Sequence, residues 1–311
     1  MRAVYIEKYG PVEDVVGFGD VPLPAVGPGE VLIEVHAASV NPIDHLTAAG
    51  FMQSAAAPEQ ARILGNDVAG IVRRVGGSVT RFAAGDEVFA RVVPGRGGTF
   101  AEFVAVDEHV VARKPASISY EQAASLPLVA LTAWQALVEK AELKPGSRVL
   151  IHAGSGGVGS IAVQLTRHLG AHVVTTAGAA SSARLKALGA DEVIDYRNQR
   201  FEDGGGDFDV VFDTVGGDTQ QRSYGVLKPG GVLVTILGAP QAQEQARRHG
   251  VRVESFFMRP DGDQLAAIAR LVESGDVQPV IDRAYPLERT RDALLYSRSG
   301  RANGKIIIQV R

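Results

Sequence analysis

Three glycines at a fixed spacing are the residues of this sequence best suited to chemistry. Gly154, Gly156 and Gly159 satisfy the pattern G-x-G-x-x-G. Such glycines make a tight turn and let the backbone approach a pyrophosphate, and the N-terminus of the helix that follows offers free N–H groups to the phosphates. The loop stands between an apolar run, 148–151, and a helical pattern, 158–169. This context predicts a dinucleotide-binding site.

The end of the next strand bears on which dinucleotide binds. An NAD site usually carries Asp or Glu about 20 residues past the loop, where it holds the ribose hydroxyls. The segment 172–180 contains neither residue. A carboxylate there would repel a 2′-phosphate, so its absence favours NADP, with Ser182 and Arg184 as candidate phosphate ligands and Lys186 and Arg197 as further ones. The alternative is NAD, with Arg184 as an ordinary exposed helix residue.

Two patterns of secondary structure must position these residues. The first ~115 residues contain short strand-like runs separated by turn residues, which favours a barrel or a rolled sheet. From about residue 121, apolar strands alternate with helices of ~10 residues, as in a parallel sheet covered on both faces. The expected strands of that sheet are 148–151, 172–176, 210–213, 232–237 and 251–257, and the expected helices are 158–169, 183–188, 220–227 and 241–249.

The end of the chain is too short to form a domain of its own. An amphipathic helix is expected at 265–273 and a last strand at 305–310, and we expect this tail to complete the N-terminal β domain. The predicted fold is therefore α/β: a β-rich domain of residues 1–118 and 260–311 encloses a doubly wound parallel-sheet domain of residues 119–259. Strand 251–257 should be an exposed edge, which favours a homodimer; the alternative is an edge covered by the C-terminal tail.

Composition excludes several classes of protein. The chain has 311 residues, no cysteine, and a formal net charge of −3. Without cysteine there is no disulfide, thiol nucleophile, iron–sulfur cluster or cysteine-containing zinc site. A negative net charge argues against nucleic acid as a partner, and no apolar run reaches the ~18–20 residues that span a membrane. The first residues lack the apolar stretch of a signal peptide, so we expect a soluble, cytoplasmic protein.

Short motifs follow one another in a fixed order along almost the whole chain. They occupy 40–44, 64–72, 85–88, 126–134, 152–164, 188–196, 212–217 and 304–305. As an ordered set they resemble the zinc-independent medium-chain dehydrogenase/reductase group, specifically quinone oxidoreductases of the zeta-crystallin type. The resemblance implies a GroES-like β-rich catalytic domain, a Rossmann-type domain and NADPH (NADP) as cofactor.

The same resemblance bears on zinc. In zinc-dependent relatives a cysteine stands where Asn41 is, and a His-Glu pair follows a glycine like Gly65, whereas this chain has Asn66 and Asp67 there. Asparagine is a poor zinc ligand, so we predict no metal. The remaining pair, His168 and His172, is interpreted as a surface pair.

The resemblance also assigns site residues. Asn41 and Thr132 should flank the nicotinamide, Gly156, Gly157 and Val158 should hold the pyrophosphate, and Tyr196 should pack near the adenosine. The full set of predicted cofactor contacts is Asn41, Thr132, Gly154, Ser155, Gly156, Gly157, Val158, Gly159, Thr176, Ala177, Ser182, Arg184, Tyr196, Val215, Gly216, Leu237, Gly238, Phe257, Asn303 and Lys305.

Three residues are candidates for the chemistry itself. Asn41 could donate a hydrogen bond to the acceptor oxygen as negative charge develops there, or it could cap the Asn41-Pro42 turn. Asp44 could be catalytic or could tie down that turn, and His45 could donate a proton or be merely solvated. Residues 52–62 are expected to form a mobile wall of the substrate site.

These features predict an NADPH-dependent reductase of a quinone-type small molecule. A first alternative keeps the fold and the cofactor but reduces the carbon–carbon double bond of enals, enones or enoyl thioesters. A second alternative is a cofactor-binding protein of low turnover with a structural or RNA-binding role.

Overall fold

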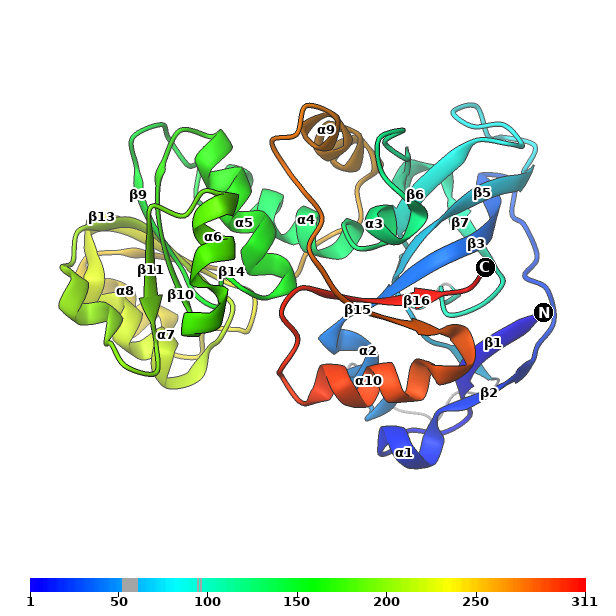
Figure 1. Ribbon diagram of the computed structural model, residues 1–311, viewed down its shortest axis with the longest axis horizontal. Coiled ribbons are helices and arrows are strands. Elements are labelled where there is room, and N and C mark those ends of the chain that lie inside the picture. The colour runs from blue at the N-terminus through cyan, green and yellow to red at the C-terminus, as the bar shows by residue number, and fades with distance from the viewer. Residues whose placement is uncertain (52–60, 94, 96) are drawn as a thin grey trace. The chain divides into compact units, whose positions relative to one another are not determined.

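The computed structural model describes residues 1–51, 61–93, 95 and 97–311, and these form two compact units (Figure 1). The β-rich unit comprises Met1–Leu128, Pro260–Ser274 and Pro279–Arg311, and the dinucleotide unit comprises Val129–Arg259 and Gly275–Gln278. Among the described residues no helix combines the length and the apolar character that crossing a membrane requires.

The β-rich unit is built on two sheets. In the described part of the chain the larger sheet has seven strands in the order β15-β16-β3-β5-β6-β8, with β7 also paired to β3, and the smaller runs β2-β1-β4. The strands are β1 (Arg2–Ile6), β2 (Gly17–Asp20), β3 (Glu30–Val40), β4 (Arg62–Ile63), β5 (Asp67–Val75), β6 (Glu87–Arg91), β7 (Phe103–Asp107), β8 (Val111–Arg113), β15 (Ile281–Pro286) and β16 (Lys305–Gln309). The helices of this unit are α1 (Val12–Val15), α2 (Pro42–Ala48), α3 (Tyr120–Ala124), α9 (Gly262–Glu273) and α10 (Thr290–Arg298).

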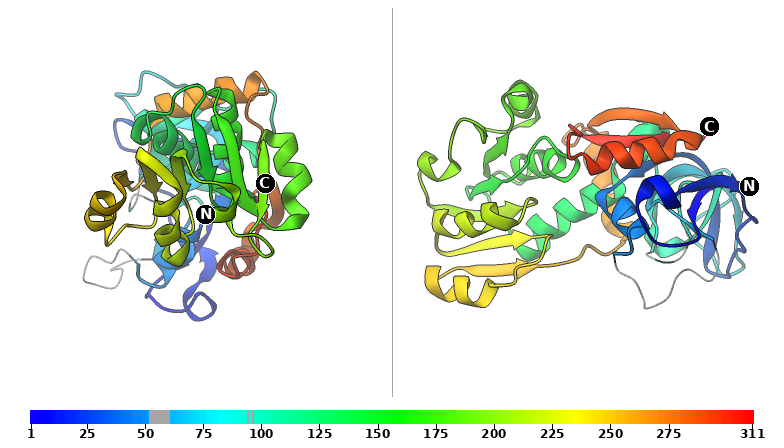
Figure 2. Two further views of the ribbon diagram at one scale, coloured as in Figure 1. Left: turned by 90° about the vertical axis from the view of Figure 1, so that its left-hand side faces the viewer. Right: turned by 90° about the horizontal axis from the view of Figure 1, so that it is seen from below.

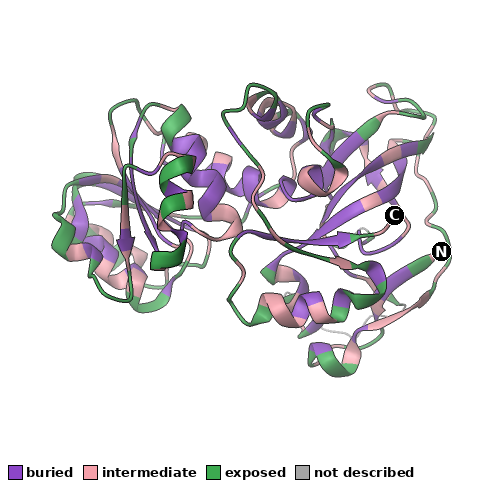
Figure 3. Cartoon of the chain, viewed as in Figure 1, coloured by how far each residue is buried: buried purple, intermediate pink, exposed green. Residues whose placement is uncertain are grey.

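Strand β3 is the centre of the larger sheet. Its side chains Val31, Ile33 and Val35 are fully buried in the apolar core of this unit (Figure 3), as expected of alternate residues, which share one face of a strand. The pairing register sets Ser39 opposite Asp67 of β5 and Val40 opposite Ile306 of β16. The end of β3 and the starts of β5 and β16 therefore meet at one place, although β16 is the last strand of the chain.

The dinucleotide unit is a six-stranded, fully parallel sheet in the order β11-β10-β9-β12-β13-β14. This is the doubly wound order 3-2-1-4-5-6, in which ligands bind where the order reverses, here between β9 and β12. Figures 1 and 2 show α5 and α6 on one face of the sheet and α7 and α8 on the other. The strands are β9 (Arg148–Ile151), β10 (His172–Ala177), β11 (Glu192–Asp195), β12 (Phe208–Asp213), β13 (Leu227–Thr235) and β14 (Arg252–Ser255), and the helices are α4 (Pro127–Trp134), α5 (Gly157–His168), α6 (Ser182–Leu188), α7 (Gly217–Ser223) and α8 (Ala242–His249).

The structure adds elements that the sequence pattern did not predict. Strand β11 is one of them, and β15 and α10 lie in a segment for which the sequence predicts no element. Residues 120–140 form α3, α4 and a π-helix, Gln135–Lys140. Helix α3 packs on β3 and β5, so the first boundary between the units falls after Leu128 rather than after residue 118.

Candidate active site

The glycine loop joins β9 to α5, at the point where the strand order reverses. A Cβ on Gly154 would lie 2.1 Å from Thr175 Oγ1, and a Cβ on Gly159 would lie 2.3 Å from the Ala153 carbonyl oxygen. Both positions therefore need glycine for the loop to pack. Helix α5 has twelve residues, and its N-cap, Gly156, makes no side-chain capping bond. The first amide groups of α5, at Gly157 and Val158, are thus not capped by a side chain, as expected of a phosphate cradle.

Four exposed apolar side chains lie along the same edge of the sheet. Tyr196 follows β11, Val215 follows β12, Leu237 follows β13 and Phe257 lies beyond β14, and each is between 47% and 59% exposed. The carboxyl ends of parallel strands form one edge of the sheet, where doubly wound folds bind their ligands. Side chains of this kind suit contact with a flat, partly apolar ligand.

The other predicted contacts of the dinucleotide unit fall at or near this edge. Thr176 and Ala177 end β10, and Ser182 and Arg184 lie in the first turn of α6. Gly216 precedes α7 and has a φ of 75°, with Leu237 packed beside it. The structure thus brings together Gly154, Ser155, Gly156, Gly157, Val158, Gly159, Thr176, Ala177, Ser182, Arg184, Tyr196, Val215, Gly216, Leu237, Gly238 and Phe257 within one unit. Thr132 lies buried in α4 of that unit.

A second group of polar residues gathers in the β-rich unit. We call Asn41, Asp44, Asn66, Asp67 and Lys305 the buried polar cluster; Asn66 is half-buried and the others are at most 5% exposed. They come from the N-terminus of α2, the start of β5 and the first residue of β16. The strand register described above places these three points side by side.

Every side chain of the cluster has a partner inside it. Lys305 Nζ donates to Asn41 Oδ1 at 2.6 Å and to the Val40 carbonyl at 2.9 Å, and lies 3.5 Å from Asp67 Oδ2. Asn41 Nδ2 donates to the same Asp67 oxygen at 2.8 Å. Asp44 accepts from the Asn41 backbone N–H at 2.7 Å and from Asn66 Nδ2 at 2.5 Å.

These bonds bear on the roles predicted for the cluster. Asn41 is the N-cap residue of α2, and its amide is already engaged on both sides. Asp44 ties down the Asn41-Pro42 turn by accepting the Asn41 backbone N–H, which is the structural alternative given for it above. Lys305 points its ammonium at Asn41, so contact of either side chain with a cofactor remains a prediction.

Burial dominates the electrostatics of Asp44. It raises the pKa of Asp44 to about 7, although the Asn41 backbone N–H and the Asn66 amide, which both bond the carboxylate, lower it. Burial likewise lowers the pKa of Lys305, whose ammonium the Asp67 carboxylate favours. The free-energy cost of keeping these buried groups charged therefore depends on pH.

We expect Asp44→Asn to stabilise the protein above about pH 7 and to change little below about pH 4. An Asp whose pKa is raised from 3.8 to about 7 binds its proton more tightly in the folded state, so its contribution is complete at low pH and is lost as the pH rises through 7. About three pKa units at ~1.4 kcal/mol each give a gain of up to about 4 kcal/mol. Urea unfolding across this pH range measures it.

The matched control is Asp14→Asn on α1, an exposed residue that should show no such dependence. The Asn66 amide can turn its oxygen toward the new NH2 group, so the variant keeps its bonds. A stability difference that does not vary with pH would contradict the proposed cost of the buried charge.

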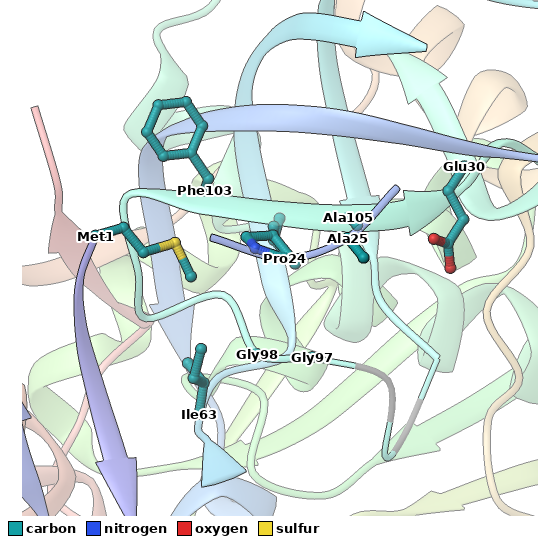
Figure 4. Close-up of a pocket in the computed structure, with 10 residues that line it drawn as sticks. Met1, Pro24, Ala25, Glu30, Ile63, Gly97, Gly98, Phe103 and Ala105 are labelled. Carbon is teal, nitrogen blue, oxygen red and sulfur yellow. The ribbon is translucent and has the colours of Figure 1, made fainter. Parts of the chain in front are cut away.

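The remaining predicted residues lie elsewhere. His45 on α2 is half-buried. Burial lowers its pKa, and the positive charge of Arg298 on α10 lowers it further. Asn303 is exposed, just before β16. Of the predicted substrate wall, residues 52–60 lie outside the described residues. A groove of about 240 Å³ on the β-rich unit, lined by Met1, Pro24, Ile63 and Phe103 among others, contains none of the predicted site residues (Figure 4).

Sequence reasoning did not assign His152 a role. It directly precedes the glycine loop and is 1% exposed, with both ring nitrogens hydrogen-bonded. Its position beside the loop was a usable signal. The hydrogen bond from Lys305 to Asn41 gave no comparable signal in the sequence, because 264 residues separate the two.

Comparisons with known proteins agree with this geometry. A model of the alcohol dehydrogenase GroES-like domain matches residues 27–116, and a model of zinc-binding dehydrogenases matches residues 188–308. A mitochondrial NAD(P)H oxidoreductase of Mus musculus is 37% identical over all of this chain and 89% of its own length. A chloroplastic NADPH-dependent alkenal/one oxidoreductase of Arabidopsis thaliana is 35% identical over 99% of this chain and 79% of its own length. The solved structure of the quinone oxidoreductase from Coxiella burnetii superposes with a TM-score of 0.93, at 34% identity, covering 100% of this chain and 99% of that one.

A GroES-like β-rich unit joined to a doubly wound sheet with a glycine loop defines a dinucleotide-dependent oxidoreductase. The chain belongs to the medium-chain dehydrogenase/reductase family, and its matches include quinone oxidoreductases of that family.

One matching model is named for zinc, but the residues of this chain do not fit that metal. Asp67 Oδ2 accepts from Ser39 and Asn41, and its Oδ1 accepts from the Leu128 N–H. The ammonium of Lys305 is the cation that this cluster already holds. Among the described residues no group of three His, Cys, Asp or Glu could hold a metal ion, and amides are poor zinc ligands.

Proposed function

We propose that this chain is a zinc-independent reductase that transfers a hydride from NADPH to a quinone-type acceptor. The observation that carries the proposal is the uncapped α5 behind the glycine loop, in a chain that matches a quinone oxidoreductase over its full length. Bound NADPH supplies the hydride. The protein's part is to bind and orient the cofactor and the acceptor.

The dinucleotide unit binds the cofactor through its backbone. In this proposal Gly156, whose own N–H donates to the Ala153 carbonyl, lets the pyrophosphate approach the backbone. The amides of Gly157 and Val158 donate to the pyrophosphate, which the N-terminus of α5 favours. Tyr196, Val215 and the other exposed apolar side chains of the edge then cover the flat parts of the ligand.

The end of β10 favours NADPH over NADH. It carries no carboxylate in Thr176, Ala177 or Gly178. Asp195, which pairs with Ala177 across the sheet, accepts from the Arg197 N–H at 3.2 Å and from Asn198 at 2.6 Å, so its carboxylate is engaged in its own turn. We propose that Ser182 and Arg184 bind the 2′-phosphate.

On the acceptor side the proposal keeps Asn41 and Thr132 beside the nicotinamide. His45 is the proposed proton donor to the reduced acceptor, since its Nδ1 has no hydrogen-bond partner among the described residues. Asp44 is assigned the positioning of α2 through its bond to the Asn41 backbone.

We expect the purified chain to oxidise NADPH rapidly when an ortho-quinone is added, and NADH about 10- to 100-fold less efficiently, because a phosphate bonded to Arg contributes roughly 1.5–3 kcal/mol. Loss of the absorbance of the reduced nicotinamide measures both rates as kcat/KM. A flat trace with the quinone, from protein that binds NADPH, would contradict the quinone assignment.

A second candidate function is reduction of the carbon–carbon double bond of an enal or enone. The similarity to an alkenal/one oxidoreductase over 99% of the chain favours it specifically. The same assay with an enone in place of the quinone separates the two.

The homodimer is proposed from the open edge of the parallel sheet. Among the described strands β14 pairs with β13 alone and β16 pairs within the β-rich unit, so the edge at 252–255 is open to the homodimer we propose. A cytoplasmic location remains a prediction, and the relative from Mus musculus is named as mitochondrial.

A further inference from the structure

His152 links three elements around the glycine loop. It follows β9 directly, its Nδ1 lies 3.2 Å from Thr176 Oγ1 of β10, and its Nε2 lies 2.8 Å from Ser223 Oγ of α7. Its backbone also holds β12, since its N–H donates to the Phe212 carbonyl. None of the roles proposed above uses this buried imidazole.

The bonds around His152 have one consistent direction. Ser223 Oγ donates its hydrogen to the Thr219 carbonyl at 2.7 Å, so it can only accept from the imidazole, and Nε2 must carry the proton. In the neutral ring Nδ1 is then a bare acceptor, which takes the Thr176 hydroxyl hydrogen. Thr176 Oγ1 in turn accepts the backbone N–H of Ala153 at 3.1 Å. A relay of donors therefore runs from Ala153 through Thr176 and His152 to Ser223.

Ala153 is a residue that needs such support. Its φ is +54°, in the left-handed region that residues with a Cβ rarely adopt. Its carbonyl accepts the Gly156 N–H at 3.0 Å and lies where a Cβ on Gly159 would be. The conformation of Ala153 thus sets both the turn of the loop and its packing against α5.

We propose that His152 is a positioning residue, which through Thr176 holds Ala153 in its left-handed conformation and so shapes the loop for the pyrophosphate of NADPH. This inference rests on the proposed function. The neutral imidazole is essential to it, because a protonated Nδ1 would donate and lose the bond from Thr176.

The surroundings keep the ring neutral. Burial lowers the pKa of His152 to about 4. Of the charged groups that face it, the carboxylates of Asp213 and Glu202 favour protonation and the Arg222 guanidinium opposes it. The edge of the ring packs on Phe201 with 4.8 Å between centroids.

Two variants of His152 test the proposal by titrating NADPH into the purified protein. His152→Phe keeps a planar ring without nitrogens, and we expect it to weaken NADPH binding about tenfold. The KM for NADPH should rise with the dissociation constant, while kcat at saturating NADPH stays close to that of the wild type. His152→Asn retains an acceptor near the position of Nδ1 and should restore binding to within about threefold of the wild type.

Thr176→Val removes the middle of the relay and should match His152→Phe. Its control is Thr166→Val on α5, a buried threonine whose hydroxyl has no partner among the described residues. Ser223→Ala removes the last acceptor of the relay, on α7. If His152→Phe fails to fold, this variant still tests the proposal, and we expect it to weaken NADPH binding about threefold. If Thr176→Val lost affinity for NADPH while the His152 variants kept it, the proposal would be overturned, since Thr176 would then contact the cofactor directly. Wild-type protein that does not bind NADPH would instead refute the proposed function, and this inference with it.

Discussion

Gly156→Ala should lower the affinity for NADPH roughly 100-fold while the free protein stays as stable as the wild type. The backbone at Gly156 has φ −77° and ψ 175°, which alanine adopts freely. A Cβ there would meet only the Ala153 carbonyl oxygen, at 3.4 Å, an ordinary contact. The methyl group would instead stand where the pyrophosphate must approach the backbone, and such overpacking costs about 1–3 kcal/mol.

Gly159→Ala should behave differently, because its Cβ would lie 2.3 Å from the Ala153 oxygen and 2.7 Å from the Gly154 Cα. We expect it to destabilise the dinucleotide unit by about 1–3 kcal/mol as well as to abolish binding. The control is Gly225→Ala, whose Cβ meets nothing within 4 Å. NADPH titration and urea unfolding of the three variants measure both effects. Wild-type affinity in Gly156→Ala would show that the phosphates bind elsewhere.

The parts of this site that the sequence predicts are those encoded over short stretches. The glycine loop is one, because a strand, a turn and a helix follow one another within some twenty residues. The edge residues Val215, Leu237 and Phe257 are another, since each follows a strand of a parallel sheet, and the carboxyl ends of such strands share an edge. Chain order alone then places them together.

The parts that the sequence does not predict depend on pairing between distant segments. Lys305 reads as the start of a strand, and only the antiparallel register of β16 with β3 turns its ammonium toward Asn41. Strand β11 has only two apolar residues between Glu192 and Asp195, so it lacks the continuous apolar run that predicts β9, a strand of the same length. The relay through His152 joins residues up to 71 positions apart, and no spacing rule connects them.

Lys305→Met should be the most destabilising single substitution in the buried polar cluster. Asp67 is fully buried, and its carboxylate lies 3.5 Å from the ammonium. Removing the ammonium leaves that buried charge with the Arg91 guanidinium as a remaining positive partner, and it strips the donor from Asn41 Oδ1. Breaking one partner of a buried ion pair costs about 3–5 kcal/mol, and urea unfolding near pH 7 should show a loss of that size. Lys8→Met, at an exposed position of the same unit, is the control and should change little.

The double variant Lys305→Met/Asp67→Asn should recover most of this loss, because it removes both members of the ion pair rather than one. The amide oxygen introduced at position 67 can still accept the Leu128 N–H. Asn41, released from Lys305, can turn its amide so that its oxygen accepts from the new NH2 group. A double-mutant cycle of unfolding free energies measures the coupling. If the double variant lost as much as the two single losses added together, the ammonium and the carboxylate would be independent, and Lys305 would not be the cation that holds this cluster.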